Sequence, residues 1–261
     1  MTQQRAIFIT GGGSGIGRAV AILFAGRGWR VGLADVNVAG MEETRALLGG
    51  ASASLHRLDV RDRAGWAEAL AAFADERGAI DVVFNNAGIA VSGPFVETSE
   101  SELDRAVAIN LMGVVNGARA AYPFLKAAGS GACLLNTASA AGIYGVSGGA
   151  IYSATKFAVR GLTESLDLEW TAEGIAVRSL MPGFIDTPLL DAVPAGSNET
   201  TRERVRSMGL EFTPVEQVAE AAWKAVHGGP LHTPIGKTAR RLAFAARWMP
   251  GRLRKGLKRR R

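Results

Sequence analysis

The strongest constraint on the fold is a regular alternation between short apolar runs and longer stretches with helical periodicity. Helical patterns fall near residues 15–27, 38–48, 63–77, 100–126 and 150–172, and the apolar runs that we interpret as strands cover residues 5–10, 30–35, 53–60, 80–88, 131–139 and 174–182. Near-continuous apolar strands require helices on both faces of a parallel sheet, joined by right-handed crossovers. We therefore predict an α/β fold with a single domain, a Rossmann-like doubly wound parallel sheet of about seven strands flanked by helices.

Composition agrees with this fold and excludes several kinds of site. A chain of 261 residues, 48% of them hydrophobic, suffices for one large α/β domain. Cys133 is the only cysteine, which excludes an internal disulfide and fits a reducing compartment. The three histidines lack the spacing of a zinc site, so we expect no metal. The early apolar run at the N-terminus and the short apolar segments favour a cytoplasmic protein.

In a doubly wound sheet, ligands bind at the carboxyl ends of the strands. The segment TGGGSGIG, residues 10–17, follows the first strand and opens the first helix. Glycine permits a tight turn and a close approach to a pyrophosphate, and a helix N-terminus supplies free N–H groups. A Gly-rich run alone is equally an ordinary turn, but its position favours a dinucleotide-binding loop. The residues expected to hold the dinucleotide here are Gly11, Ser14, Gly15, Ile16 and Gly17.

Two aspartates near strand ends bear on the adenosine half of the dinucleotide. Asp35 ends the second strand, where a carboxylate accepts hydrogen bonds from a ribose and repels a 2′-phosphate. No Lys or Arg precedes Gly15 in the loop or directly follows Asp35, which favours NAD over NADP, although Arg18 keeps NADP open. Asp59 and Val60 end the third strand and are placed to recognise adenine. Helix capping is the alternative interpretation of both aspartates.

Two further motifs point to the reacting end of such a ligand. NNAG, residues 85–88, ends the fourth strand, and its Asn86, Ala87 and Gly88 leave room for a flat ligand. YSATK places Tyr152 and Lys156 one helical turn apart. A neighbouring ammonium favours the phenolate form of tyrosine, which makes a proton-transfer group near neutral pH. A half-buried tyrosine beside a solvated lysine is the alternative.

Taken together, these motifs resemble the short-chain dehydrogenase/reductase superfamily, from residue 5 to about residue 235. The matching pieces are TGGGSGIG (10–17), Asp35, DV (59–60), NNAG (85–88), IN (109–110), NTASAAG (136–142), YSATK (152–156) and PGFIDT (182–187). One position departs from the family, because Ala138 precedes Ser139 where two serines are usual. The second serine, which matches the catalytic one, is kept.

The resemblance implies a role for each of the matching residues. Tyr152 would be the general acid/base, and Lys156 would lower its pKa and hold the nicotinamide ribose. Ser139 would orient the substrate oxygen, and Asn110 would hold a water at a break in the fourth helix. An amide that satisfies helix backbone is the alternative for Asn110, as an ordinary turn is for PGFIDT. The resemblance also implies a cofactor contact for Pro182, Gly183, Ile185 and Thr187.

The resulting hypothesis is an NAD(H)-dependent oxidoreductase that interconverts a secondary alcohol and a ketone. The expected pocket walls are mostly apolar and contain no Lys or Arg, which favours a lipophilic substrate; they are Ala90, Val91, Ser92, Ala140, Ile143, Tyr144, Val146, Phe184, Leu189 and Leu190. A non-catalytic dinucleotide-sensing or membrane-docking protein with the same fold is the alternative. We expect a dinucleotide-binding and catalytic domain over residues 1–236, with a lid near 187–213, and by resemblance a homodimer or homotetramer.

The net charge of +6 belongs to the C-terminal extension, residues 237–261, and its neighbourhood. Residues 1–220 contain 18 Lys and Arg against 24 Asp and Glu, whereas residues 221–261 contain 12 Lys and Arg and no acid. In the extension, Leu242, Ala245, Trp248 and Met249 recur at helical spacing, and Pro250–Gly251 breaks the helix. Such endings resemble family members that act on sterols, retinoids or other lipids. Peripheral contact with an anionic membrane is one interpretation, and packing on the domain or on a partner subunit is the other; nucleic acid is not expected.

Overall fold

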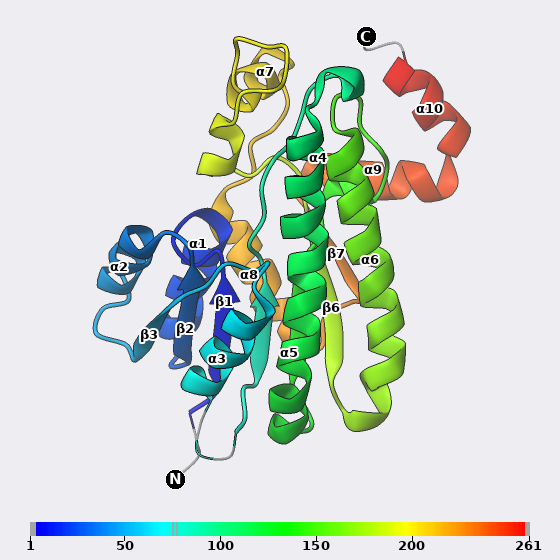
Figure 1. Cartoon of the computed structure of the whole chain (residues 1–261). Coiled ribbons are helices and arrows are strands. Elements are labelled where there is room, and N and C mark those ends of the chain that lie inside the picture. The colour runs from blue at the N-terminus through cyan, green and yellow to red at the C-terminus, as the bar shows by residue number, and fades with distance from the viewer. Residues whose placement is uncertain (1–3, 75, 77, 259–261) are drawn as a thin grey trace.

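The computed structural model describes residues 4–74, 76 and 78–258. Seven strands within these residues form one parallel sheet in the order β3-β2-β1-β4-β5-β6-β7 (Figure 1). The strands are β1 (Ala6–Thr10), β2 (Arg30–Asp35), β3 (Ala53–Arg57), β4 (Val82–Asn85), β5 (Cys133–Thr137), β6 (Ala176–Pro182) and β7 (His232–Ile235). The predicted α/β fold is therefore confirmed. The strand order reverses between β1 and β4, which marks the place where doubly wound sheets bind ligands.

Helices cover both faces of the sheet, and each face has its own apolar core (Figure 1). On one face, Phe24 and Met41 pack with β-strand residues such as Ile9; the helices there are α1 (Gly15–Gly26), α2 (Val38–Ala46) and α8 (Val215–Val226). On the other face, Trp66 and Leu125 pack around Phe8; the helices there are α3 (Arg63–Phe73), α5 (Gly113–Ala128) and α6 (Ala150–Trp170). Short 3₁₀ segments complete the connections at η1 (Phe95–Glu97), η3 (Ala140–Gly142) and η4 (Thr171–Glu173).

The third strand ends earlier than the sequence predicts. β3 stops at Arg57, and a turn closed by a hydrogen bond from the Asp62 N–H to the Asp59 carbonyl follows at 2.9 Å. The Asp59 carboxylate also accepts the backbone N–H of Arg61 at 3.0 Å. Such local bonds favour a turn over a ladder, so Asp59 and Val60 lie in the loop after β3 and not in the strand.

The predicted long helix over residues 100–126 is divided at Asn110, as expected. A capping box lies at its start: Ser99 accepts the N–H of Glu102, and the Glu102 carboxylate accepts the N–H of Ser99. Helix α4 (Glu100–Val107) passes into one turn of π-helix, η2 (Ala108–Met112), before α5 begins at Gly113. A π-turn frees local backbone groups and re-aims side chains, and such turns occur often at functional sites.

Residues 187–213 cross the carboxyl end of the sheet without forming a strand (Figure 1). They contain η5 (Pro188–Asp191) and α7 (Thr201–Ser207). Arg202 fastens the two parts together, because its guanidinium pairs with Asp186 and Asp191 and donates to the Thr187 carbonyl. Opening and closing of this segment as a lid stays a prediction.

The C-terminal extension forms two helices, α9 (Lys237–Trp248) and α10 (Pro250–Lys258). α9 ends directly before Pro250, as predicted. Leu242 packs against the body of the protein, whereas the side chain of Trp248 is 65% exposed. The apolar stripe predicted from helical spacing is therefore divided between an inner and an outer side. None of the helices in the described part of the chain has the length and apolar character needed to cross a bilayer.

Candidate active site

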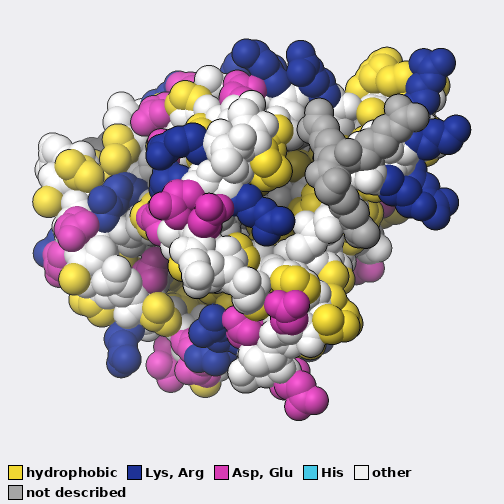
Figure 2. Space-filling model, turned by 90° about the horizontal axis from the view of Figure 1, so that it is seen from above, with side chains coloured by type: hydrophobic (Ala, Val, Ile, Leu, Met, Phe, Trp, Pro, Cys, Tyr) yellow, Lys and Arg dark blue, Asp and Glu magenta, His cyan; other side chains and the backbone are white. Residues whose placement is uncertain are grey.

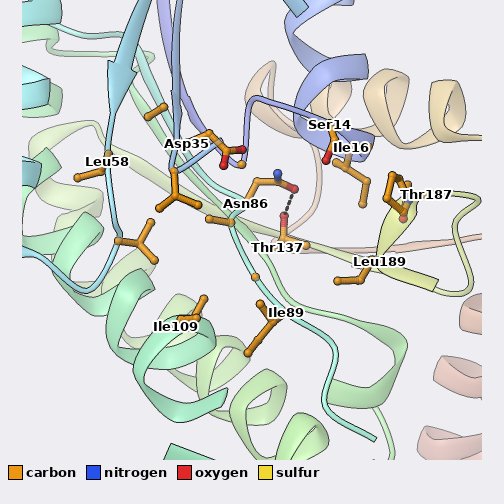
Figure 3. Close-up of a pocket in the computed structure, with 18 of the residues that line it drawn as sticks. Ser14, Ile16, Asp35, Leu58, Asn86, Ile89, Ile109, Thr137, Thr187 and Leu189 are labelled. Atoms are coloured by element: carbon orange, nitrogen blue, oxygen red, sulfur yellow. Dashed lines mark hydrogen bonds between the residues drawn. The ribbon is translucent and has the colours of Figure 1, made fainter. Parts of the chain in front are cut away.

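A cleft of about 370 Å³ opens at the carboxyl ends of the strands, around the point where the strand order reverses (Figure 3). Most of the residues predicted to bind the dinucleotide line it: Gly11, Ser14, Gly15, Ile16, Asp35, Asp59, Val60, Asn86, Ala87, Gly88, Tyr152, Lys156 and Thr187. Six predicted residues do not line it, namely Gly17, Asn110, Ser139, Pro182, Gly183 and Ile185. Gly17, Asn110 and Ser139 contact the groups that do, whereas Pro182, Gly183 and Ile185 are not placed at the cleft, and the binding or catalytic role of every residue in both sets stays a prediction.

The glycine loop has the close packing that a phosphate-binding turn requires. Gly11 has φ of +69°, and a Cβ there would lie 2.9 Å from the Asn86 side chain. A Cβ on Gly17 would lie 2.1 Å from the Gly11 carbonyl oxygen, so α1 meets the loop at a distance that only glycine allows. Ser14 precedes α1 without a side-chain capping bond, and the first turn holds no acid. The N–H groups at this helix end can therefore receive an anion.

Asp35 holds the glycine loop and lines the cleft beside it (Figure 3). Its carboxylate accepts the N–H of Gly13 and the N–H of Asn37, each at 3.0 Å. Arg18 is already engaged, because its guanidinium donates to the Gly13 carbonyl at 2.6 Å and pairs with Glu43 at 2.8 Å. Arg18 is the residue for which NADP stayed an alternative in the sequence analysis. Its guanidinium is thus held by contacts with the glycine loop and with α2.

Arg61 is a cleft residue that the sequence analysis missed. Its guanidinium binds the Asp59 carboxylate, with Nε 3.0 Å from each oxygen, and this hydrogen bond lowers the pKa of Asp59. Helix α3 is capped instead by Asp62, whose side chain accepts the N–H of Ala64. The capping interpretation of Asp59 is therefore wrong, and the Asp59–Arg61 pair presents both charges to the cleft wall.

A second missed feature joins three strands at the floor of the cleft. The Thr10 hydroxyl accepts the N–H groups of Asn86 and Ala87 at 3.0 and 3.1 Å. The Asn86 side chain donates to the Thr10 carbonyl at 3.0 Å and accepts the Thr137 hydroxyl at 3.1 Å (Figure 3). These bonds lock the ends of β1, β4 and β5 together. Thr10 and Thr137 are the last residues of their strands, which is the signal that could have found them.

Asn110 lies in the π-turn, fully buried, and binds the chain that leaves β4. Its Oδ1 accepts the N–H of Ile89 at 2.8 Å, and its Nδ2 donates to the Ile89 carbonyl at 2.9 Å. The amide thus satisfies backbone, though of a loop and not of a helix. A Cβ on Gly88 would come within 3.0 Å of Asn110 Oδ1. This contact fixes one wall of the cleft, and the water expected at Asn110 stays a prediction.

Ser139, Tyr152 and Lys156 converge where β5 and α6 meet. Ser139, two residues after the end of β5, is hydrogen-bonded to Tyr152 and accepts the N–H of Ala141 at 3.1 Å. Lys156 is 3% exposed, and its Nζ donates to the Thr137 carbonyl at 2.8 Å and lies 5.6 Å from the centroid of the Tyr152 ring. The one-turn spacing on α6 therefore places a phenol and an ammonium side by side at the cleft.

The pKa shifts in this group are dominated by burial. Burial lowers the pKa of Lys156 from 10.5 to about 8. It also raises the pKa of Tyr152, while the hydrogen bond with Ser139 acts in the opposite direction. The net shift of Tyr152 is thus opposite to the lowering that the sequence analysis expects. The reason is that burial raises the free energy of the phenolate by more than the hydrogen bond with Ser139 lowers it.

The predicted substrate walls are only partly brought together. Leu189 lines the main cleft, whereas Val146 lines a second hollow of about 470 Å³ between the segments after β4 and β5 and helix α7. Arg204 of α7 also lines this hollow. The surroundings of the cleft are therefore less uniformly apolar than the sequence predicts. In the described part of the chain, no group of three or more His, Cys, Asp or Glu side chains is placed to hold a metal.

Comparison with known proteins identifies relatives of this arrangement. A family model described as short chain dehydrogenase matches residues 5–198. Levodione reductase of Leifsonia aquatica is 36% identical over 223 residues, which are 84% of this chain and 83% of that protein. A crystal structure of a short-chain dehydrogenase/reductase from Burkholderia phymatum in complex with NAD has a TM-score of 0.84 at 26% identity and covers 97% of this chain and 95% of its own.

A longer relative shares the same region. The "Probable oxidoreductase EphD" of Mycobacterium tuberculosis is 32% identical over 262 residues, a match that covers 95% of this chain. The chain spans only 44% of the length of that protein.

Proposed function

Because the chain belongs to the short-chain dehydrogenase family, we propose that it is an NAD(H)-dependent oxidoreductase that interconverts a secondary alcohol and a ketone. One observation carries this proposal: Tyr152 and Lys156 line the same cleft as the glycine loop, and Ser139 is hydrogen-bonded to Tyr152. A proton-transfer group is thereby brought next to a site for a dinucleotide. That arrangement suits hydride transfer coupled to proton transfer.

The cleft residues fit a dinucleotide. The pyrophosphate would lie at the N-terminus of α1, where Gly11 leaves space that a Cβ would fill. Asp35 would accept hydrogen bonds from the adenosine ribose, and the pairing of Arg18 with Glu43 supports NAD over NADP. Lys156 would hold the other ribose. When bound, the nicotinamide supplies or accepts the hydride.

Three side chains would take part in the proton transfer. Ser139 would donate a hydrogen bond to the substrate oxygen and orient it. Tyr152 would give its phenolic proton to that oxygen during reduction, or take a proton from it during oxidation. The raised pKa of Tyr152 keeps this proton on the phenol, and a positive charge beside the ring would favour its release. Lys156, at 5.6 Å from the ring, is the chain's own source of that charge.

We further infer a lipophilic substrate. The apolar side chains of Ile89, Ile109 and Leu189 line the cleft (Figure 3). A relative named for the reduction of levodione supports a ketone as the reducible group. The homodimer or homotetramer expected from the family stays a prediction, and light scattering of the purified protein would measure it.

The direct test is oxidation of NADH or reduction of NAD⁺ against a panel of lipophilic ketones and secondary alcohols. Turnover with at least one pair, and weaker turnover with the NADP forms, is the expected result. NADH binding without turnover across the panel would instead indicate a dinucleotide-sensing protein. Absence of any dinucleotide binding would refute the proposal altogether.

A further inference from the structure

Helix α9 is firmly attached to the body of the protein along one side. Ala239 is fully buried, and Leu242, Ala243 and Ala246 pack on a cluster that includes Val159. These positions recur every three or four residues, which places them on one side of a helix. α9 has therefore already buried its apolar side against its own domain, and its opposite side needs a separate explanation.

The outer side of α9 combines aromatic and basic residues. The Phe244 side chain is 59% exposed and that of Trp248 is 65% exposed, although both belong to types that normally bury. They lie one turn apart, among exposed Arg240, Arg241 and Arg247. We call this set the basic aromatic face of α9.

Helix α10 also carries exposed basic residues, and it projects away from the body of the protein. It packs against α9 and projects at the carboxyl end of the sheet (Figure 1). Its Leu257 is partly exposed, between exposed Arg254, Lys255 and Lys258. Seen from that end, Lys and Arg side chains gather at the edge where α10 lies (Figure 2). Both helices therefore carry exposed basic side chains, and we call the exposed sides of α9 and α10 together the outer surface.

The charge of this surface is uncompensated. Elsewhere in the protein, arginines such as Arg18, Arg27 and Arg202 are paired with carboxylates. Within residues 4–74, 76 and 78–258, no carboxylate oxygen lies within 4.0 Å of the cations of the outer surface, which are Arg240, Arg241, Arg247, Arg252, Arg254, Lys255 and Lys258. Residues 221–261 hold no acidic residue that could supply one. The charges of such a surface can be neutralised only by an anionic partner that is not part of these residues.

We propose that the basic aromatic face of α9, together with α10, docks the protein onto an anionic lipid surface. Aromatic side chains prefer the boundary between lipid headgroups and acyl chains, and clustered Lys and Arg are attracted to anionic headgroups. The same face on a second copy would carry the same charge and be repelled. Nucleic acid would use the charges and stack bases on the aromatic rings, but it would leave Leu257 without an apolar partner.

Docking would orient the active-site end toward the lipid. α9 packs near η3, the segment that follows Ser139, and α7 lies at the same end of the molecule (Figure 1). A lipophilic substrate dissolved in the bilayer would then reach the cleft without crossing water, a consequence that rests on the proposed function. Docking itself does not depend on turnover, so the two can be tested apart.

Trp248 provides a direct probe of docking. The other four tryptophans are buried or half-buried, so Trp248 dominates any response to the outer environment. We expect vesicles of phosphatidylcholine with phosphatidylglycerol to shift its emission to shorter wavelength and to shield it from acrylamide. Pure phosphatidylcholine vesicles should do neither, and Trp248→Phe should lose the response while still co-sedimenting.

Co-sedimentation with the same vesicles tests the two components of the surface. We expect Phe244→Ala with Trp248→Ala, and separately Arg240→Glu with Arg241→Glu, to reduce the bound fraction at least about tenfold. These side chains point away from the body, so circular dichroism and thermal unfolding should change little. The matched charge control is Arg57→Glu with Arg105→Glu, two exposed arginines on β3 and α4, which should bind as the unaltered protein does.

Each other outcome overturns the proposal. Equal binding to neutral and anionic vesicles, or no binding to either, excludes an electrostatic lipid surface. Tight binding to RNA or DNA that Phe244→Ala with Trp248→Ala leaves unchanged would assign the charges to nucleic acid. A change of oligomeric state in the aromatic variant would assign the face to a subunit interface.

Discussion

Replacing Lys156 by methionine should change how the stability of the protein depends on pH. The ammonium is 3% exposed and its main polar contact is the Thr137 carbonyl at 2.8 Å, so the folded state holds a charge with little water around it. Burial lowers the pKa of Lys156 from 10.5 to about 8. Methionine has nearly the same shape and no proton to lose, so the variant removes this titration and little else.

The sign and size of the effect follow from proton binding. Between pH 8 and pH 10.5 the unfolded chain keeps the lysine proton and the folded protein loses it. Stability must rise with pH wherever the unfolded state binds more protons. The free energy of unfolding of the unaltered protein, minus that of Lys156→Met, should therefore increase by about 3 kcal/mol across this window, at 1.36 kcal/mol per pH unit. Most of it, ~2 kcal/mol, should appear between pH 7.5 and pH 10.

Urea unfolding of both proteins at a series of pH values, without added dinucleotide, measures this difference. Other titrating groups are shared and cancel. Lys224→Met, at a lysine that is exposed on α8, is the matched control for the chemical change from lysine to methionine. A flat profile for Lys156→Met would show that its ammonium is not desolvated, and the account of the site would be wrong on this point.

Three further predictions test other parts of the cleft. Gly17→Ala should destabilise the protein by roughly 2 kcal/mol or more and abolish NADH binding, because its Cβ would meet the Gly11 carbonyl at 2.1 Å; Gly26→Ala, at the end of the same helix with nothing within 4 Å, should be neutral or slightly stabilising in thermal unfolding. Asp35→Asn removes the negative charge that would repel a 2′-phosphate, so the preference for NADH over NADPH in titration calorimetry should fall by about tenfold. An unchanged preference would show that Asp35 only supports the loop. Ser139→Ala should lower kcat by about 10²-fold with little change in the Kd for NADH, and an equal loss of both would point to a structural role.

Much of the fold was predictable because its signals are local. Alternating strand and helix patterns predict a doubly wound parallel sheet through general rules of handedness and connection, and the capping box at Ser99 depends on only four consecutive residues. Tyr152 and Lys156 could be brought together from spacing alone, since residues four apart share a helix face. Strand ends that meet at one edge of the sheet then place Asp35 and Asn86 at the same cleft.

The rest depends on contacts between distant segments, which no local pattern encodes. The bonds from Thr10 to Asn86 and from Asn86 to Thr137 join three strands that are far apart in sequence. The turn formed by Asp59 and Arg61 replaces the end of the predicted strand, so β3 is shorter than the strand pattern predicts. The raised pKa of Tyr152 depends on how deeply the tertiary structure buries the phenol, which spacing cannot reveal.

The outer side of α9 shows the same limit. Helical periodicity groups Leu242 and Trp248 in one stripe, but packing against the body selects only the first of them. Which aromatic residues of α9 are exposed depends on which side of the helix packs against the body, and helical spacing alone does not determine that side.

The central claim is that Tyr152 transfers the proton while hydride moves in the same cleft. The most direct measurement is turnover of Tyr152→Phe beside its Kd for NADH, with the best ketone from the panel. We predict a loss of kcat of at least about 10²-fold, with NADH binding kept within about twofold, because the phenolic proton goes to the substrate oxygen while the other residues that line the cleft still hold the dinucleotide. Turnover equal to that of the unaltered protein would contradict the account.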